Sequence, residues 1–332
     1  MTTIQTRGLT RRFQSGGAEV NAVRGVDLDV EPGQIVGFLG PNGAGKTTTL
    51  RMLATLLRPT AGTAEIAGVD LIKDPITVRR RIGYVAQSSG TDPGCLVHEE
   101  INDQARLYRL GGAEARTRTQ QLLGEFDLLT IRDRPVRTLS GGQRRRLDIA
   151  MGLVHSPQVL LLDEPTSGLD PQSRGNVWDH VLALRADRGT TILLTTHYLE
   201  EADALCDRIF VIDHGRIVTW GSPDELKRRI AGDLLTVEVF RDPDLAKSTL
   251  AGLPGVREVA VSELTVRLIV ESGEHAVIDV MRALDAAGVP TRSIQVARPS
   301  LDDVFFAVTG RTLRDGDQAV QAPADPAAEE EA

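Results

Sequence analysis

Residues 40–47 read Gly40-Pro41-Asn42-Gly43-Ala44-Gly45-Lys46-Thr47, which is a complete GxxxxGK[ST] phosphate loop. The apolar run 35–39 predicts a short buried strand before it, and leucines at positions 50, 53, 56 and 57 predict a helix that continues until Pro59. The backbone N–H groups of such a loop and the positive end of the helix bind phosphate. Lys46 is expected to reach the β- and γ-phosphates, and the Thr47 hydroxyl to bind Mg²⁺. The alternative, a glycine-rich turn that binds nothing, is disfavoured by the complete motif in this context.

A second helix start suited to phosphate follows at Leu139-Ser140-Gly141-Gly142-Gln143. Ser140 and Gln143 have capping-box spacing, and the glycines let a phosphate approach the backbone. Alone, this stretch indicates only an ordinary capped helix. Together with the phosphate loop, it resembles the ATP-binding-cassette (ABC) ATPases, whose signature motif is LSGGQ and covers the ATP held by the opposing protomer. The resemblance implies an α/β P-loop NTPase fold, with a RecA-like core plus a helical subdomain.

Two adjacent carboxylates end the apolar run 159–162, at Asp163 and Glu164. A continuous apolar run predicts a strand buried on both faces of a parallel sheet. Asp163 is expected to hold Mg²⁺ through water, and Glu164 to polarise the attacking water as general base. Paired carboxylates at a strand end are usually a solvated turn, but here a buried strand delivers them.

The resemblance implies roles for three further residues. Asp170, in Ser167-Gly168-Leu169-Asp170, matches the D-loop, which communicates across the dimer. His197 follows the apolar strand 191–196 and matches the switch histidine that contacts the γ-phosphate. Gln87 matches the Q-loop glutamine, which senses Mg²⁺ and water and connects the core to the helical subdomain. Without the resemblance, a lone histidine is more often structural, and Gln87 would be read as a surface loop residue.

The resemblance also implies an aromatic residue that stacks on adenine. The family most often has Tyr there, and the candidate here is Phe13, whose ring offers the required π face. The alternative is that Phe13 belongs to the core. The expected ATP-binding set is therefore Phe13, the loop from Gly40 to Thr47, and Thr48.

Composition fits a globular ATPase of about two domains. The chain has 332 residues, of which 41% are hydrophobic. No signal peptide and no apolar run of about 18 residues is evident. Its two cysteines, Cys95 and Cys206, form no metal motif, which favours a reducing cytoplasm. The net charge of −8 includes six acidic residues after Arg314, where no basic residue occurs, so the remainder carries −2 and no nucleic-acid partner is expected.

We predict three segments. Residues 1–222 form the ABC ATPase domain, with the helical subdomain at about 88–157, and residues 311–332 form a disordered acidic tail. Between them, residues 233–298 alternate in a β-α-β-β-α-β order that predicts a small α+β ferredoxin-like module. A capped helix over 300–310 completes a C-terminal accessory domain of residues 233–310. Dimer support is the preferred role of this domain, and small-molecule sensing the alternative.

The second segment sharpens the resemblance. Over about residues 5–310 the chain is similar to the ATPase subunits of daunorubicin/doxorubicin-resistance-type (ABC-2) exporters. The similarity lies in residues 144–150 after the signature, in residues 194–203 around the switch, and in the closing segment 300–310. Several members of that subfamily have Gln at the switch position, whereas His197 here favours the ordinary hydrolytic arrangement.

The implied machine is a homodimer that binds two ATP·Mg²⁺ at its interface, each between Lys46 of one protomer and Ser140 of the other. A separate integral membrane permease subunit would contact the helical subdomain near Gln87, at the cytoplasmic face of a bacterial cell membrane. The work would be export of a drug-like or lipid-like compound.

Three rivals share the nucleotide motifs. An importer ATPase typically carries a β-barrel regulatory domain, which differs from the pattern of residues 233–298. A ribosome-acting ABC protein usually has two cassettes, and a DNA-repair ATPase has long coiled coils; neither pattern is present in the sequence. A non-enzymatic binding module is disfavoured by Glu164 and His197 together.

Overall fold

The structure is a computed structural model, which describes residues 2–15, 18–230, 232–297 and 300–309. The chain divides into two compact units, the first ending at Trp220 and the second beginning at Gly221. The acidic tail predicted over residues 311–332, and Gly310 at the end of the predicted last helix, lie outside the described residues.

The first unit is built on a six-stranded sheet with the order β10-β9-β3-β8-β7-β6. Its central strands pair in parallel, and β3, β7 and β8 are buried along their whole lengths, as is typical of strands in the middle of a parallel sheet. The strands are β3 (Ile35–Leu39), β6 (Ile82–Val85), β7 (Val159–Asp163), β8 (Thr191–Thr196), β9 (Arg208–Asp213) and β10 (Arg216–Gly221). The carboxyl ends of the parallel strands β3, β6, β7, β8 and β9 therefore meet at one edge of the sheet.

A smaller antiparallel sheet packs below the first, with the order β2-β1-β4-β5. Its strands are β1 (Ile4–Ser15), β2 (Ala18–Val30), β4 (Ala61–Ile66) and β5 (Val69–Asp70). Helix α1 (Lys46–Leu53) lies between the two sheets, and a shared core of buried side chains joins Ile4, Phe38, Leu50 and Phe210. Each fully buried aliphatic or aromatic side chain contributes about 1.5–3 kcal/mol to folding.

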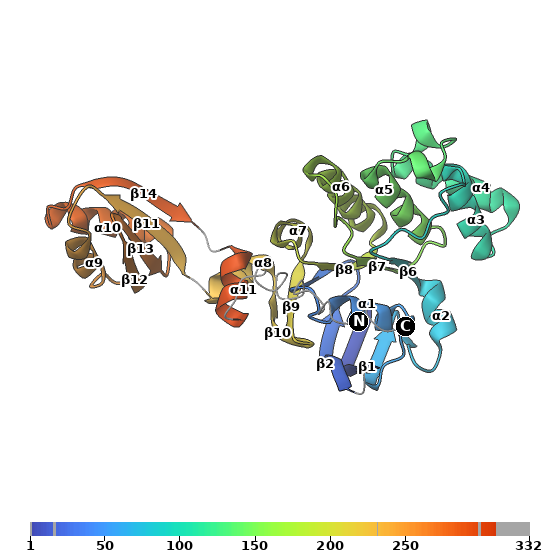
Figure 1. Cartoon of the computed structure of the whole chain (residues 1–332), viewed down its shortest axis with the longest axis horizontal. Helices are drawn as coiled ribbons and strands as arrows, with labels where there is room; N and C mark the ends of the chain where they lie inside the picture. Colours follow the sequence, from blue (N-terminus) through green and yellow to red (C-terminus); the bar gives the residue numbers. More distant parts are fainter. Residues whose placement is uncertain (1, 16–17, 231, 298–299, 310–332) are drawn as a thin grey trace, which may run out of the picture. The chain divides into compact units, whose positions relative to one another are not determined.

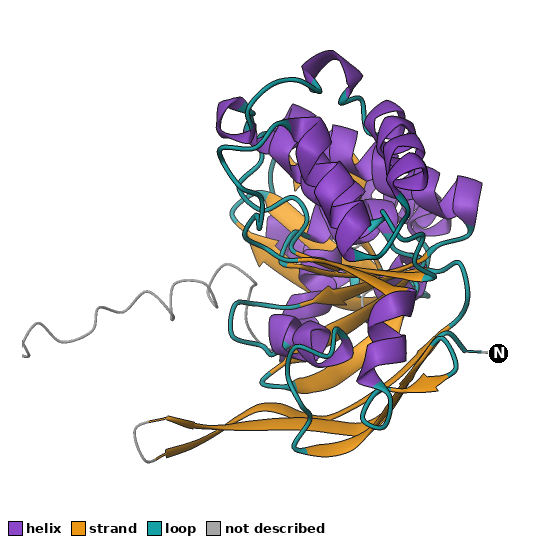
Figure 2. Cartoon of the chain, turned by 90° about the vertical axis from the view of Figure 1, so that its right-hand side faces the viewer, coloured by secondary structure: helices purple, strands orange, loops and turns teal. Residues whose placement is uncertain are grey.

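Helices cover the opposite side of the six-stranded sheet, as Figures 1 and 2 show. Neighbouring helices α3 and α4 lie beside α5, and α6 follows the stretch 167–170. The helices of this unit after α1 are α2 (Pro75–Arg81), α3 (Val97–Leu107), α4 (Gly112–Glu125), α5 (Gly141–Gly152), α6 (Pro171–Arg188) and α7 (Leu199–Leu205), with two 3₁₀ turns at Leu129–Ile131 and Val136–Thr138.

One helix is shorter than its sequence pattern predicts. The leucine periodicity predicted that the helix after the phosphate loop runs to Pro59, but α1 ends at Leu53. Thr55 adopts a left-handed backbone (φ 61°), which terminates the helix, and Leu56 is 58% exposed. The prediction was wrong because Leu56 and Leu57 continue the helical spacing of leucines for only a few residues, and so short a stretch can equally be a turn after the helix.

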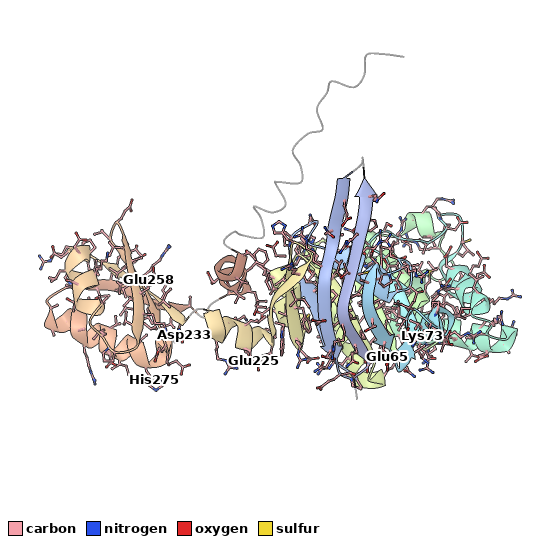
Figure 3. All side chains as sticks on the ribbon, turned by 90° about the horizontal axis from the view of Figure 1, so that it is seen from below. Glu65, Lys73, Glu225, Asp233, Glu258 and His275 are labelled. Atoms are coloured by element: carbon pink, nitrogen blue, oxygen red, sulfur yellow. The ribbon has the colours of Figure 1, made fainter. Side chains whose placement is uncertain are left out.

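The second unit contains an antiparallel sheet with the order β12-β13-β11-β14, which is the ferredoxin-like arrangement of a β-α-β-β-α-β module. Its elements are β11 (Asp233–Val239), α9 (Pro243–Leu250), β12 (Val256–Ser262), β13 (Thr265–Val270), α10 (Gly273–Ala286) and β14 (Thr291–Ala297), preceded by α8 (Pro223–Ile230) and followed by α11 (Leu301–Thr309). Both helices of the module pack on the sheet through a separate core that includes Leu235, Leu250 and Leu284. The Asp233 carboxylate (Figure 3) accepts the Gly273 N–H at 2.6 Å at the start of α10.

Candidate functional site

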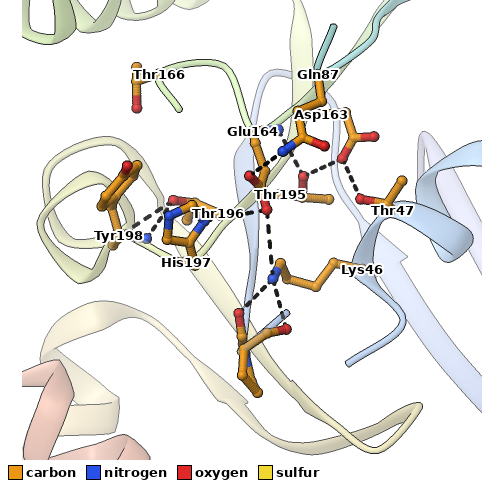
Figure 4. Close-up of polar contacts among 12 residues, drawn as sticks. Lys46, Thr47, Gln87, Asp163, Glu164, Thr166, Thr195, Thr196, His197 and Tyr198 are labelled. Carbon is orange, nitrogen blue, oxygen red and sulfur yellow. Dashed lines mark hydrogen bonds and ion pairs between the residues drawn. The ribbon is translucent and has the colours of Figure 1, made fainter. Parts of the chain in front are cut away.

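The phosphate loop leaves β3 and enters α1 at Lys46 (Figure 4). The Lys46 side chain is only 4% exposed, and its ammonium donates hydrogen bonds to the carbonyls of Gly40 (2.6 Å) and Pro41 (3.0 Å). These bonds hold the cation inside the curve of the loop. No side chain caps α1, because its N-cap is Gly45, so its first N–H groups face the loop without a side-chain acceptor.

The glycines of the loop are required by space and by backbone conformation. A Cβ at Gly40 would lie 2.2 Å from the Ile212 carbonyl oxygen, and one at Gly45 would lie 2.5 Å from that of Ala22. Gly45 also has φ 102°, a conformation that other residues rarely adopt. By contrast, nothing lies within 4 Å of a Cβ at Gly43, so this part of the loop is open to a ligand.

Asp163 at the end of β7 faces the first residues of α1. Its Oδ1 accepts hydrogen bonds from the Thr47 hydroxyl at 2.8 Å and from the Thr195 hydroxyl at 2.7 Å, and the carboxylate is fully buried. Tyr84, on β6, lies 3.5 Å away through its hydroxyl. Three strands and one helix therefore fix a single carboxylate.

Glu164 is the centre of the polar cluster. Its Oε2 accepts a hydrogen bond from the Gln87 amide at 2.9 Å, and its Oε1 lies 3.3 Å from His197 Nδ1 and 4.0 Å from Lys46 Nζ. The backbone N–H of Glu164 donates to Thr195 Oγ1 at 2.9 Å. Burial favours the neutral acid, but the neighbouring His197 and Lys46 outweigh it and lower the pKa of Glu164. The carboxylate is thus ionised at neutral pH.

His197 is held from one side by aromatic contact. Its ring centroid lies 4.1 Å from that of Tyr198, and the Arg174 guanidinium carbon sits 4.2 Å from the centre of the Tyr198 ring. The Tyr198 N–H donates to the Thr196 hydroxyl at 2.9 Å, which fixes the turn after β8. The histidine consequently points toward Glu164 (Figure 4).

The signature stretch has the predicted cap. Ser140 Oγ accepts the Gln143 N–H at 3.3 Å, and the Gln143 amide oxygen accepts the Ser140 N–H at 3.1 Å, so α5 begins with a capping box. Ser140 and Gly141 are exposed, whereas Gly142 is buried: a Cβ there would lie 2.7 Å from Ser173 Oγ. Leu139 is 9% exposed and anchors the start of the stretch.

The remaining predicted residues lie apart from this cluster. Asp170 caps α6 by accepting the Ser173 N–H at 2.9 Å, and this bonding lowers its pKa. Phe13, on β1, is half-buried and does not belong to the buried core; the Arg11 guanidinium carbon lies 4.6 Å from its ring centre. Thr48 lies within α1 and is half-buried.

Sequence reasoning missed Thr195, which bonds both Asp163 and Glu164. Its signal was present: two hydroxyl residues, Thr195 and Thr196, end an otherwise apolar strand at the edge where ligands bind in α/β sheets.

Two regions of the chain match known families. Residues 23–167 match the ABC transporter family, and residues 221–309 match the C-terminal domain of DrrA1-3-like ATP-binding proteins. Daunorubicin resistance ATP-binding protein DrrA2 of Streptomyces coeruleorubidus is 46% identical over 92% of this chain and 95% of that protein. The chain belongs to the ABC transporter ATP-binding proteins. The P-loop NTPase fold, the resemblance to daunorubicin/doxorubicin-resistance-type ATPases and the expected ATPase activity are thereby confirmed.

Other relatives place this ABC ATPase among exporter subunits. Daunorubicin/doxorubicin resistance ATP-binding protein DrrA of Streptomyces peucetius is 43% identical over 94% of both chains. Nod factor export ATP-binding protein I of Ralstonia nicotianae is 40% identical over 94% of this chain and 95% of that protein. This ABC ATPase is therefore the ATP-hydrolysing subunit of an ABC exporter, as the sequence predicted.

Solved structures agree on the nucleotide-binding unit. A dimeric post-hydrolysis state of the ATP-binding cassette MJ0796, bound to ADP and Pi, superposes with a TM-score of 0.60 at 28% identity, covering 66% of this chain and 98% of that one. The structure of cbiO1 from Clostridium perfringens, part of the ABC transporter complex cbiONQ, has a TM-score of 0.62 at 28% identity and covers 69% of this chain and 91% of that one. In the described part of this ABC ATPase, no helix has both the length and the hydrophobicity of a membrane span.

Proposed function

We propose that this ABC ATPase binds ATP·Mg²⁺ at the loop from Gly40 to Thr47 and hydrolyses it with Glu164 as general base. The observation that supports this most directly is the convergence of Lys46, Gln87 and His197 on the Glu164 carboxylate (Figure 4). A carboxylate with a lowered pKa is ionised at neutral pH and accepts a hydrogen bond from water.

The donor set suits Mg²⁺. The Thr47 hydroxyl and the Asp163 carboxylate already lie 2.8 Å apart, and the Gln87 amide bonds the neighbouring Glu164, so the cluster contains hydroxyl, carboxylate and amide groups. Mg²⁺ prefers such oxygen ligands together with water and nucleotide phosphates. When bound, the ion supplies positive charge to the phosphate oxygens. Asp163 would act through water, and Thr47 directly.

The chain's own groups would then take three tasks. Lys46 exchanges the carbonyls of Gly40 and Pro41 for β- and γ-phosphate oxygens, which are stronger acceptors for a cation. Glu164 orients the attacking water, and His197 contacts the γ-phosphate, the role the resemblance implies. Because Gln87 bonds Glu164 directly, movement of the Q-loop changes the position of the base.

We place the second half of each ATP site on another copy of the chain. The exposed start of α5, at Ser140 and Gly141, has backbone N–H groups and glycines suited to phosphate, and Leu139 and Gln143 frame it. Asp170 would meet the opposing protomer, and Phe13 would stack on adenine. A homodimer with two interfacial ATP molecules follows.

The cargo proposal comes from the relatives. Proteins named for daunorubicin and doxorubicin resistance and for Nod factor export match over nearly the whole chain. We therefore propose efflux of a drug-like or lipid-like compound, and hence antibiotic resistance, through a separate membrane permease at the cytoplasmic face of the bacterial membrane. The C-terminal module would support the dimer.

The test uses the tagged full-length Glu164→Gln variant, with ATP and Mg²⁺, in detergent-solubilised membranes of the native host. ATP turnover should stop, ATP-bound dimers should accumulate, and a multi-spanning membrane protein should co-purify. Turnover at the wild-type rate would reject Glu164 as the base. Ribosomes, DNA or no partner would reject export while leaving the ATPase in place.

A further inference from the structure

A buried arginine connects the signature helix to the catalytic strand. Arg145, in the second turn of α5, is 6% exposed, and its guanidinium donates to the backbone carbonyls of Asp163 (2.9 Å) and Pro165 (2.7 Å). These two carbonyls flank Glu164. One planar, rigid donor group therefore grips the backbone on both sides of the proposed base.

The backbone conformation of Glu164 requires stabilising hydrogen bonds of this kind. Its φ is 44°, in the left-handed region that non-glycine residues avoid. Such a conformation persists only where the surroundings over-determine it. Here Thr195 fixes the Glu164 N–H, and Arg145 fixes the carbonyls before and after it.

Side chains of the same helix, α5, also form hydrogen bonds with the Q-loop on both sides of Gln87. Arg145 Nη1 donates to the Ala86 carbonyl at 2.6 Å, and the Asp148 carboxylate accepts the Ser89 hydroxyl at 2.7 Å. Arg145 and Asp148 are three residues apart, so they lie on one face of α5.

We infer that Arg145 and Asp148 are positioning residues that couple the signature motif to the base Glu164 and to Gln87 within the same chain. The inference rests on the proposed function, in which the start of α5 binds the ATP of the opposing protomer. A shift of α5 when that ATP arrives would be transmitted to both Gln87 and Glu164, because the same helix face holds both. Each protomer would thereby align its own water-orienting groups only when its signature motif is occupied.

The experiment compares purified full-length variants for kcat, for KM and for ATP-dependent dimer formation in a Glu164→Gln background. Arg145→Gln retains one donor group and should lower kcat by about 10- to 100-fold, since small misplacements of reacting groups have effects of this size. KM should stay within about threefold, and dimers should still form, because the phosphate loop and the α5 cap are intact. Arg145→Lys should restore little, because an ammonium does not reproduce the planar fork.

Arg144→Gln is the matched control. This neighbouring arginine donates to the Val136 carbonyl at 3.1 Å, away from Glu164 and Gln87, and the variant should keep kcat within about twofold. Further variants test the coupling if the Arg145 variants fold poorly. Ser89→Ala should lower kcat by about 3- to 10-fold with KM unchanged. Asp148→Asn keeps an acceptor for the Ser89 hydroxyl and should therefore lower kcat less than Asp148→Leu.

The coupling would be overturned if Arg145→Gln kept the wild-type kcat. It would also be overturned if Arg145→Gln and Ser89→Ala both lost ATP binding, dimer formation and turnover together, because the contact would then be purely structural. Either result leaves the Glu164-dependent ATPase standing. Failure of the proposed function is seen separately, as wild-type turnover in Glu164→Gln alone.

Discussion

Two helix starts in this ABC ATPase are suited to phosphate, and they are built differently. α1 begins in the phosphate loop with a left-handed Gly45 and no side-chain cap, whereas α5 begins at an exposed Ser140 whose capping box is complete. An uncapped start leaves N–H groups for a ligand to satisfy, and a capped start is stable without one. The difference supports our proposal that α1 forms the primary ATP site and that α5 completes the site of a second copy of the chain.

The largest loss of ATP turnover should come from a substitution in the phosphate loop at the start of α1. Lys46→Gln removes the side-chain cation that lies inside the curve of the loop, and should lower turnover by about 100-fold or more. ATP binding to the monomer should weaken as well, measured with a fluorescent nucleotide. Unchanged binding in this variant would mean that the two helix starts do not differ as we argue.

Gly142→Ala tests the other start. A Cβ at this position would press on Ser173 Oγ and Cβ, at 2.7 and 2.8 Å, and would force α5 away from α6. Overpacking of this kind costs about 1–3 kcal/mol of stability, which thermal unfolding would report. ATP binding to the monomer should be unaffected, while dimers in the Glu164→Gln background should be lost.

Gly141→Ala provides the contrast, because the nearest atom to its added Cβ, on Leu169, is 3.3 Å away at the end of a flexible side chain. Its effect on stability should be clearly smaller. Equal losses in the two variants would show that the tight contact with Ser173 does not matter.

Ser140→Ala removes the cap of α5 and should cost about 1 kcal/mol of stability. Dimer formation should weaken moderately and ATP affinity of the monomer should not change, because α1 holds the primary site. Weaker monomer binding would place Ser140 in the primary site and would remove the distinction between the two starts.

The smallest effect is the pH dependence of stability that comes from Glu164, which lies near Lys46 of the phosphate loop. The pKa of Glu164 is lowered from its ordinary value of 4.5, so the carboxylate's contribution to stability is present above that pH and is lost as pH falls through the folded-state pKa. The stability difference between wild type and Glu164→Gln, measured by urea unfolding, should therefore shrink below about pH 4.5. A constant difference from pH 7 to pH 3.5 would contradict the lowered pKa.

The sequence predicted the parts of the site that a strand end or a contiguous motif determines. Lys46, Thr47, Asp163 and Glu164 fall together because parallel strands deliver their carboxyl ends to one edge. The β-α-β-β-α-β order was also readable, since its apolar alternation is regular. The roles of Lys46, Thr47, Asp163 and Glu164 in hydrolysis remain predictions.

Other features were not readable for physical reasons. Arg145 stands in a run of three arginines, and only the fold shows that this one is buried against carbonyls. Thr195 was hidden in an apolar run. The end of α1 at Leu53 depends on a backbone turn at Thr55, which no side-chain spacing announces.

The left-handed backbone at Glu164 also has an evolutionary consequence. Glycine adopts φ 44° freely, so Glu164→Gly relieves about 1–3 kcal/mol of strain, and a single base change in either glutamate codon produces it. Drift would therefore find a less strained chain, without the proposed base, one mutation away. A lineage that no longer meets the exported compound has little to keep glutamate at this position, and its loss would be an early mark of a decaying transporter.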